Sequence, residues 1–314
     1  MVRPGSRGLS TIVGVALPFF AVLLCGMLAA RLRLIDDAGL IGLNAFVFWF
    51  ALPALLFHKV AVTPFARLTD WTLYVGYEGA CLLVYLLVLL AVRLVFRRSL
   101  GEAAILAFAA AWGNVGYMGV PLLGSAYGEA GGLPAILAVV LDSLILQTLT
   151  ILLLESATGS RRGGVRIVVS AVLHNPLIVA VVAGAVVAGL GIALPAPVLG
   201  FLGLLGPAAA AGALFALGAT LRGGALVEKV PLVGGTIAVK LLLVPAVAWL
   251  GLQIIPVPAD LQAPLVVTTA LPTAASVFVI AQRYGILERP AAAIVFGSHL
   301  LGIVTLTVLL VWLR

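Results

Sequence analysis

The sequence predicts an all-α integral membrane protein of ten transmembrane helices, arranged as two inverted repeats of five helices each. Composition is the first observation, because 63% of the 314 residues are hydrophobic and only 9% are charged. The second is that ten apolar stretches have roughly the length needed to cross a bilayer. The third is that the fourth and ninth stretches carry glycine and proline in their middles. Because the two interruptions are offset by five spans, each repeat has an odd number of spans. The second repeat therefore inserts with the opposite orientation in the membrane.

Composition also excludes several classes of protein. A soluble domain of this size needs a charged, hydrated surface, which this chain lacks. The net charge of +7 does not indicate nucleic acid, because the basic residues stand singly or in pairs between apolar stretches. Cys25 and Cys81 lie inside such stretches and the three histidines are scattered, so no disulfide, metal site or other cofactor is expected. Ser298 and His299 are neighbours whose side chains diverge on a helix, so they do not predict an enzyme.

A helix needs about 20 apolar residues to cross about 30 Å of hydrocarbon. On this rule the sequence predicts spans at residues 9–30, 38–58, 70–92, 102–126, 133–154, 167–190, 197–220, 231–254, 261–283 and 289–313. The first span is too long for the apolar core of a signal peptide, so we expect it to remain as a helix. The longest polar connection, ESATGSRRGGVR, gives a first five-helix repeat (1–157), a cytoplasmic linker (158–166) and a second, inverted repeat (167–314).

The distribution of basic residues predicts the orientation of these helices. The odd-numbered connections carry twelve of them: Arg31, Arg33, Arg93, Arg97, Arg98, Arg161, Arg162, Arg166, Arg222, Lys229, Arg283 and Arg289. The even-numbered connections and the two termini carry five: Arg3, Arg7, Lys59, Arg67 and Arg314. Because basic residues favour the cytoplasmic side, we expect a multi-pass protein of the plasma (bacterial inner) membrane with both termini outside the cytoplasm.

The fourth and ninth spans are interrupted helices. In the fourth, Gly113, Gly116 and Gly119 weaken the helix, and Pro121 removes a backbone donor. Pro121 is well suited to open a second half-helix, because its missing N–H group would be unpaired there anyway. In the ninth, Pro272 lies near the middle of the span. Unwound backbone is tolerated in a bilayer only inside protein or beside water, so both breaks are expected to be functional rather than simple kinks or close-packing sites.

Crossed at their breaks, the two spans bring two half-helix N-termini to the middle of the membrane. Each N-terminus carries roughly half a positive charge and free N–H donors, which suits a carboxylate. Asn114, Thr273 and Ser276 would add neutral hydrogen bonds. The predicted binding residues are therefore Asn114, Gly113, Gly116, Gly119, Pro121, Pro272, Thr273 and Ser276.

Four ionisable residues and one amide lie inside predicted spans. An ionisable side chain in the bilayer is costly unless it is paired or hydrated, so each is a candidate for function. Glu78, Asp142, Lys240 and His299 form either a proton or cation relay or a fixed brace across the helices, with Lys240 and a carboxylate as a candidate pair. His299 is either an interhelical hydrogen-bonding group or a proton carrier. Gln147 either lines the binding site or joins two helices.

Five segments resemble the auxin efflux carrier family, which includes the plant PIN-type carriers and many bacterial permeases. They occur in the family's order over essentially the whole chain: NAFVFWFALPALLF (Asn44–Phe57), GNVGYMGVPLLGSAYG (Gly113–Gly128), HNPLIVAVVAG (His174–Gly184), VKLLLVPAVA (Val239–Ala248) and ALPTAASVFVIAQRYG (Ala270–Gly285). Each motif is weak alone, and the ordered set is fairly specific.

The resemblance implies ten helices in two inverted repeats, with a scaffold made from the first, second, sixth and seventh spans. The other six spans would form a transport domain that moves like an elevator, and the scaffold would join two subunits in a homodimer. Family members move organic anions, which are auxins in plants and dicarboxylates such as malate or malonate in some bacteria. Plant carriers place an asparagine beside the proline in both crossing spans. Here only Asn114 is present, so recognition of indole acids does not carry over.

These features predict a permease for small organic anions that contacts the lipid bilayer and binds no nucleic acid. Two alternatives remain: a sodium-coupled organic-anion symporter of the bile-acid type, and a membrane ligand sensor that does not transport. The ninth span offers threonine and serine hydroxyls but no acid, so the sequence does not predict a strong sodium site there.

Overall fold

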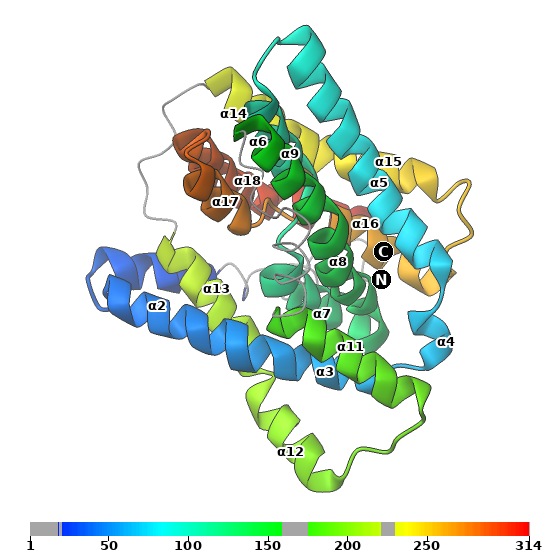
Figure 1. Ribbon diagram of the computed structural model, residues 1–314. Helices are drawn as coiled ribbons and strands as arrows, with labels where there is room; N and C mark the ends of the chain where they lie inside the picture. The colour runs from blue at the N-terminus through cyan, green and yellow to red at the C-terminus, as the bar shows by residue number, and fades with distance from the viewer. Residues whose placement is uncertain (1–17, 19–20, 159–174, 221–229, 314) are drawn as a thin grey trace, which may run out of the picture.

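The computed structural model describes residues 18, 21–158, 175–220 and 230–313, and these residues form helices joined by short connections (Figure 1). The described helices are Ala21–Arg31, α2 (Asp37–Phe46), η1 (Val47–Ala51), α3 (Leu52–Ala61), α4 (Phe65–Leu68), α5 (Trp71–Leu90), η2 (Ala91–Val95), α6 (Leu100–Ala111), η3 (Val115–Gly119), α7 (Val120–Gly131), α8 (Leu133–Asp142), η4 (Ser143–Gln147), α9 (Thr148–Thr158), α11 (Pro176–Gly189), α12 (Ala196–Leu205), α13 (Ala208–Thr220), α14 (Val230–Ala238), η5 (Val239–Leu243), α15 (Val244–Gly251), α16 (Ala259–Thr269), α17 (Ser276–Tyr284) and α18 (Glu288–Trp312). The elements written η are π-helical turns.

The described residues contain five continuous helical segments that are long and apolar enough to cross a membrane. These segments are Asp37–Ala61, Phe65–Val95, Leu133–Thr158, Val230–Gly251 and Glu288–Trp312. The fold is therefore that of an all-helical, multi-pass membrane protein, as the composition predicted. The other five predicted stretches hold shorter helices, and two of them, like the polar linker, fall partly outside the described residues. Ten spans and their inverted repetition stay predictions.

The side chains agree with a lipid environment around the molecule. Large apolar residues are strongly exposed, among them Leu204 (84%) and Ile254 (86%). By contrast, α6 is buried on almost every side, because α5, α9, α14, α17 and α18 pack around it. Such a helix, apolar all round, is typical of the middle of a membrane bundle. Ser99 and Glu102 form a capping box at its N-terminus, which defines where this central helix begins.

Three of the π-helical turns end two residues before a proline. A proline has no N–H group and its ring clashes with the carbonyl of the preceding turn, and a local π turn accommodates both effects. The wider turn therefore lets each helix continue past its proline. The pairs are η1 with Pro53, η3 with Pro121, and η5 with Pro245.

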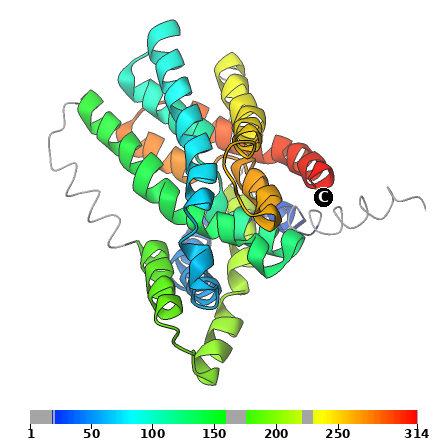
Figure 2. The same cartoon turned by 90° about the vertical axis from the view of Figure 1, so that its right-hand side faces the viewer.

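The helices form two groups in space. In Figure 1 the lower group holds α2, α3, α11, α12 and α13, and the upper group holds α5, α6, α9 and α14 to α18. Within the lower group α3 packs on α11 and α2 packs on α13, while in the upper group α5 packs on α6 and α15. Figure 2, turned by 90°, shows the same separation, with α11 and α12 far from α14 and α15. The scaffold and transport domain that the family resemblance implies stay predictions.

Candidate functional site

The breaks between α6 and η3 and between α16 and α17 lie against each other. The amide of Asn114 donates a hydrogen bond to the carbonyl oxygen of Pro272 over 2.7 Å. Gly113 and Thr273 form an isolated antiparallel β-bridge. Backbone groups released by one break are thus paired with those of the other, which meets the requirement for buried polar groups in a membrane. The two segments are 160 residues apart at the bridge, so this pairing is entirely tertiary.

The start of the second half-helix differs from the sequence prediction. Pro121 was expected to open it, but the helix resumes at Val115, in η3. The amide of Val120 bonds to the carbonyl of Val115 in the π register, and Pro121 follows this turn directly. The prediction for Pro121 is wrong because the glycine-containing segment before it unwinds first and the π turn accommodates the proline.

Lys240 lies at the centre of the crossing. Its side chain is fully buried, and its Nζ donates hydrogen bonds to the carbonyl oxygens of Ala111 (3.1 Å) and Thr269 (2.9 Å). These two residues are the last of α6 and α16, so one ammonium group caps the negative ends of two half-helices. A Cβ atom on Gly113 would lie 3.3 Å from Nζ, which explains a glycine here. The geometry supports the brace rather than the relay for Lys240.

Thr273 fixes the ninth span to its neighbours. Its Oγ1 donates to the carbonyl oxygen of Ala109 over 2.8 Å, and its amide donates to Oγ of Ser298 over 3.1 Å. Ser298 in turn donates to the carbonyl of Val295, and both side chains are fully buried. Thr273 therefore holds α6, the second break and α18 together. Sequence reasoning missed Ser298, because only its place beside Thr273 in space gives it this role.

We expect Thr273→Val to destabilise the crossing. Valine replaces the hydroxyl with a methyl group of similar size, so the carbonyl of Ala109 loses a buried donor at a cost of about 1–3 kcal/mol. Thermal unfolding of the purified protein in detergent, followed by circular dichroism, measures the loss. Thr273→Ser, which keeps the hydroxyl, is the matched control, and equal melting temperatures for the valine variant and the unchanged protein would contradict the assignment.

Asn114 and His299 meet beside the first break. The Nδ2 of Asn114 and the Nε2 of His299 are 3.1 Å apart, and the Nδ1 of His299 lies 2.8 Å from the carbonyl of Val295. Because a carbonyl only accepts, Nδ1 carries the ring proton and the neutral Nε2 accepts from the amide of Asn114. The exposed fraction is 4% for Asn114 and 1% for His299. His299 therefore acts here as an interhelical hydrogen-bonding group.

The remaining predicted binding residues occupy different places around the breaks. Ser276 begins α17 and is half-buried, with the exposed Ala275 before it. A Cβ atom on Gly119 would lie 2.6 Å from Cδ1 of Leu271, so Gly119 allows close packing of the two spans. A Cβ atom on Gly116 would meet its nearest neighbour only at 3.6 Å. Gly119 is thus explained by packing, whereas packing does not require Gly116.

The electrostatics of the crossing leave positive charge at one pair of helix ends. The negative C-terminal ends of α6 and α16, about half a charge each, face the ammonium of Lys240. The positive N-terminal ends of η3 and α17 have no acidic residue in their first turns. About one unit of positive charge therefore remains at these two N-termini, one of which begins directly after Asn114, and it suits an anionic ligand.

Glu78, Asp142 and Gln147 lie on the elements that flank the crossing. Glu78 is on α5, Asp142 ends α8, and both are buried. The hydroxyl of Tyr77 donates to Oδ2 of Asp142 over 3.0 Å, a contact that the sequence alone did not reveal. Gln147 ends η4 and is half-buried. Among the described residues, no group of three His, Cys, Asp or Glu side chains could hold a metal ion.

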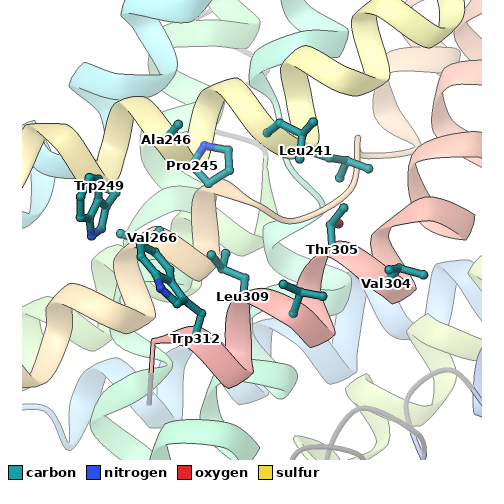
Figure 3. A pocket seen from close by; sticks show the side chains of 11 residues that line it. Leu241, Pro245, Ala246, Trp249, Val266, Val304, Thr305, Leu309 and Trp312 are labelled. Carbon is teal, nitrogen blue, oxygen red and sulfur yellow. The ribbon is translucent and has the colours of Figure 1, made fainter.

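An apolar groove of about 360 Å³ lies between η5–α15 and the C-terminal half of α18 (Figure 3). Trp249 and Trp312, whose ring centroids are 5.6 Å apart, lie at one end of it. Thr305 is the polar residue of a lining that contains no amide or charged side chain. The groove therefore does not suit a carboxylate, and the anion site is better sought at the helix breaks.

A multi-pass helical protein whose two broken helices cross inside the bundle belongs by its architecture among membrane transport proteins. The family model described as "Membrane transport protein" matches residues 11–310. A protein of Rhizobium meliloti (strain 1021), named "Putative malonate transporter", is 33% identical over 317 aligned positions that cover 98% of this chain and 97% of the relative. The chain belongs to this membrane transport family, the auxin efflux carrier group that its motifs indicated, and it is a transporter rather than an enzyme.

Proposed function

We propose that this protein is a permease for small organic anions in the bacterial inner membrane, with both termini outside the cytoplasm. The anion binds where the N-termini of η3 and α17 meet Asn114. Ten spans in two inverted repeats carry it by an elevator movement of α5 to α9 and α14 to α18 against the scaffold. The scaffold spans also join two subunits in a homodimer.

The charge distribution at the crossing is the observation that carries this proposal. Lys240 bonds to both helix C-termini, so their negative ends are compensated inside the protein. The two N-termini keep about one unit of positive charge. A carboxylate placed there gains N–H donors and opposite charge in a region of low dielectric, where both are strong.

The similar protein from Rhizobium meliloti suggests which anions to test first. Its name refers to malonate, a three-carbon dicarboxylate. One carboxylate of such a molecule fits the positive charge of the crossing, and the second needs a further partner. We therefore place small dicarboxylates before bulky aromatic acids as substrates.

We expect Asn114→Ala to weaken anion binding while the protein stays folded. The change removes an amide beside the proposed carboxylate position, and a hydrogen bond to a charged group is worth about 1.5–3 kcal/mol, or roughly tenfold or more in affinity. Transient currents on a solid-supported membrane, measured for a panel of mono- and dicarboxylates, give the apparent affinity. Gln253→Ala, which removes an exposed amide, is the control.

Normal transport by a folded Asn114→Ala protein would show that the site lies elsewhere. Uptake of radiolabelled malonate would separate electroneutral transport from a sensor if the unchanged protein gives no current. An absence of uptake in every arrangement of gradients would favour the sensor.

The sodium-coupled alternative has weaker support. Thr268 and Thr269 donate their hydroxyl hydrogens to backbone carbonyls of their own helix. The ammonium of Lys240 also lies against the freed carbonyls of α6 and α16, where a bound sodium ion would need ligands. An unchanged transport rate after replacement of sodium by choline is therefore expected.

A further inference from the structure

Two buried carboxyl groups lie beside the crossing without bonding to it. Glu78 on α5 is 6% exposed and Asp142 at the end of α8 is fully buried. Oδ2 of Asp142 accepts from Tyr77, but its Oδ1 and both oxygens of Glu78 have no hydrogen-bond partner within the described residues. An ionised carboxylate buried without partners is costly, so this geometry favours a carboxyl group that carries a proton.

The charges around the two carboxyl groups set how many protons they hold. Asp142 lies within electrostatic range of both Glu78 and Lys240. Two carboxylates beside one ammonium leave an excess of one negative charge, and two like charges at a shared buried site do not both ionise readily. A single proton held by the pair makes the three groups neutral together.

Other titratable groups around Glu78 do not replace this proton. On α5 itself, Tyr77 and Cys81 are neutral neighbours within the membrane. Of the elements packed against α5, α6 carries Glu102 in its first turn, α16 carries Asp260 in an exposed ion pair, and α15 has no charged residue. Arg93 on η2 is exposed. Asp142 is therefore the charged group that acts on Glu78 in the interior, and Lys240 acts on Asp142.

We propose that Glu78 and Asp142 form a proton-binding site whose occupancy is coupled to the organic anion, which makes the protein a proton–anion symporter. This inference rests on the proposed anion permease. An anion at the crossing adds negative charge beside Lys240 and so favours a proton on the carboxyl pair, and by linkage the proton favours the anion equally.

The test uses the full-length protein in proteoliposomes loaded with and without unlabelled malonate. An inside-alkaline gradient of one pH unit is expected to raise the accumulation of radiolabelled malonate about tenfold for one proton per anion. Glu78→Gln keeps the shape of the side chain but cannot release a proton. It is expected to retain malonate counterflow and to lose the response to the gradient, whereas Asp260→Asn, at the exposed ion pair, keeps both.

A Glu78→Gln protein that still responds to the gradient, or an unchanged protein that performs counterflow with no response to it, would overturn the coupling alone. Absence of malonate counterflow by the unchanged protein would instead overturn the proposed permease. If Glu78→Gln does not fold, the coupling is tested with the unchanged protein alone. A pH-sensitive dye inside the vesicles then measures the internal pH as malonate enters. Acidification on malonate entry supports the symporter, and a constant internal pH refutes it.

Discussion

Replacement of Lys240 by methionine is expected to abolish transport and to lower the free energy of unfolding by about 3 kcal/mol or more. Methionine has a similar length but cannot donate a hydrogen bond. The carbonyls of Ala111 and Thr269 would then lose their shared donor, and each charge-assisted bond is worth about 1.5–3 kcal/mol. The half-charges at two helix ends would also remain uncompensated in a medium of low dielectric. Denaturation in mild detergent, followed by circular dichroism, measures the change.

Two comparison variants make the expected result for Lys240 specific. Lys59→Met removes a lysine at the end of α3 and is expected to change stability by less than about 1 kcal/mol. Asp142→Asn distinguishes two roles of Lys240, the helix cap and an ion pair with Asp142. If the ion pair were the main interaction of Lys240, Asp142→Asn would be as unstable as Lys240→Met. We expect Asp142→Asn to fold, since the two hydrogen bonds of Lys240 go to backbone carbonyls. Equal stability of Lys240→Met and the unchanged protein would refute the cap.

The sequence was sufficient to predict the helical membrane fold and the two breaks, because both depend on local properties. The length of an apolar stretch predicts a span. A proline predicts a break, and Pro272 lies within the observed break between α16 and α17. The extent of the other break was not predictable in the same way. A π turn before Pro121 has no strong local signal, so the proline was assigned to a helix start that lies six residues earlier, at Val115.

The partners of the candidate site residues could not be predicted, because they depend on contacts between distant segments. Lys240 bonds to a carbonyl 129 residues away, and Thr273 bonds to one 164 residues away. The sequence left Lys240 open as a relay or a brace, and it grouped Thr273 with the binding residues. The structure instead gives the hydroxyl of Thr273 a buried backbone acceptor, while the half-buried Ser276 keeps a position beside a helix N-terminus.

A second large effect is expected where the first described helix, Ala21–Arg31, crosses α13. A Cβ atom on Gly218 would lie 1.8 Å from the carbonyl oxygen of Leu23, and one on Gly26 would lie 2.0 Å from that of Phe215. Real carbon–oxygen contacts are longer by more than about 1 Å, so any side chain must push the two backbones apart. Close approach through small residues is a main source of attraction between membrane helices, which lack a hydrophobic driving force in lipid.

We therefore expect Gly218→Val to prevent recovery of folded protein, with a loss of at least about 3 kcal/mol. Gly203→Val is the matched control, because Gly203 on α12 has open space where a Cβ would be placed. The yield of monodisperse protein after detergent extraction and its thermal unfolding measure both variants. Gly218→Ala tests the same contact with the smallest side chain and should lower the melting temperature even if the protein folds. A normal yield and melting temperature for Gly218→Val would mean that the crossing is wider in solution than in the structure, and these two helices would then need another source of attraction.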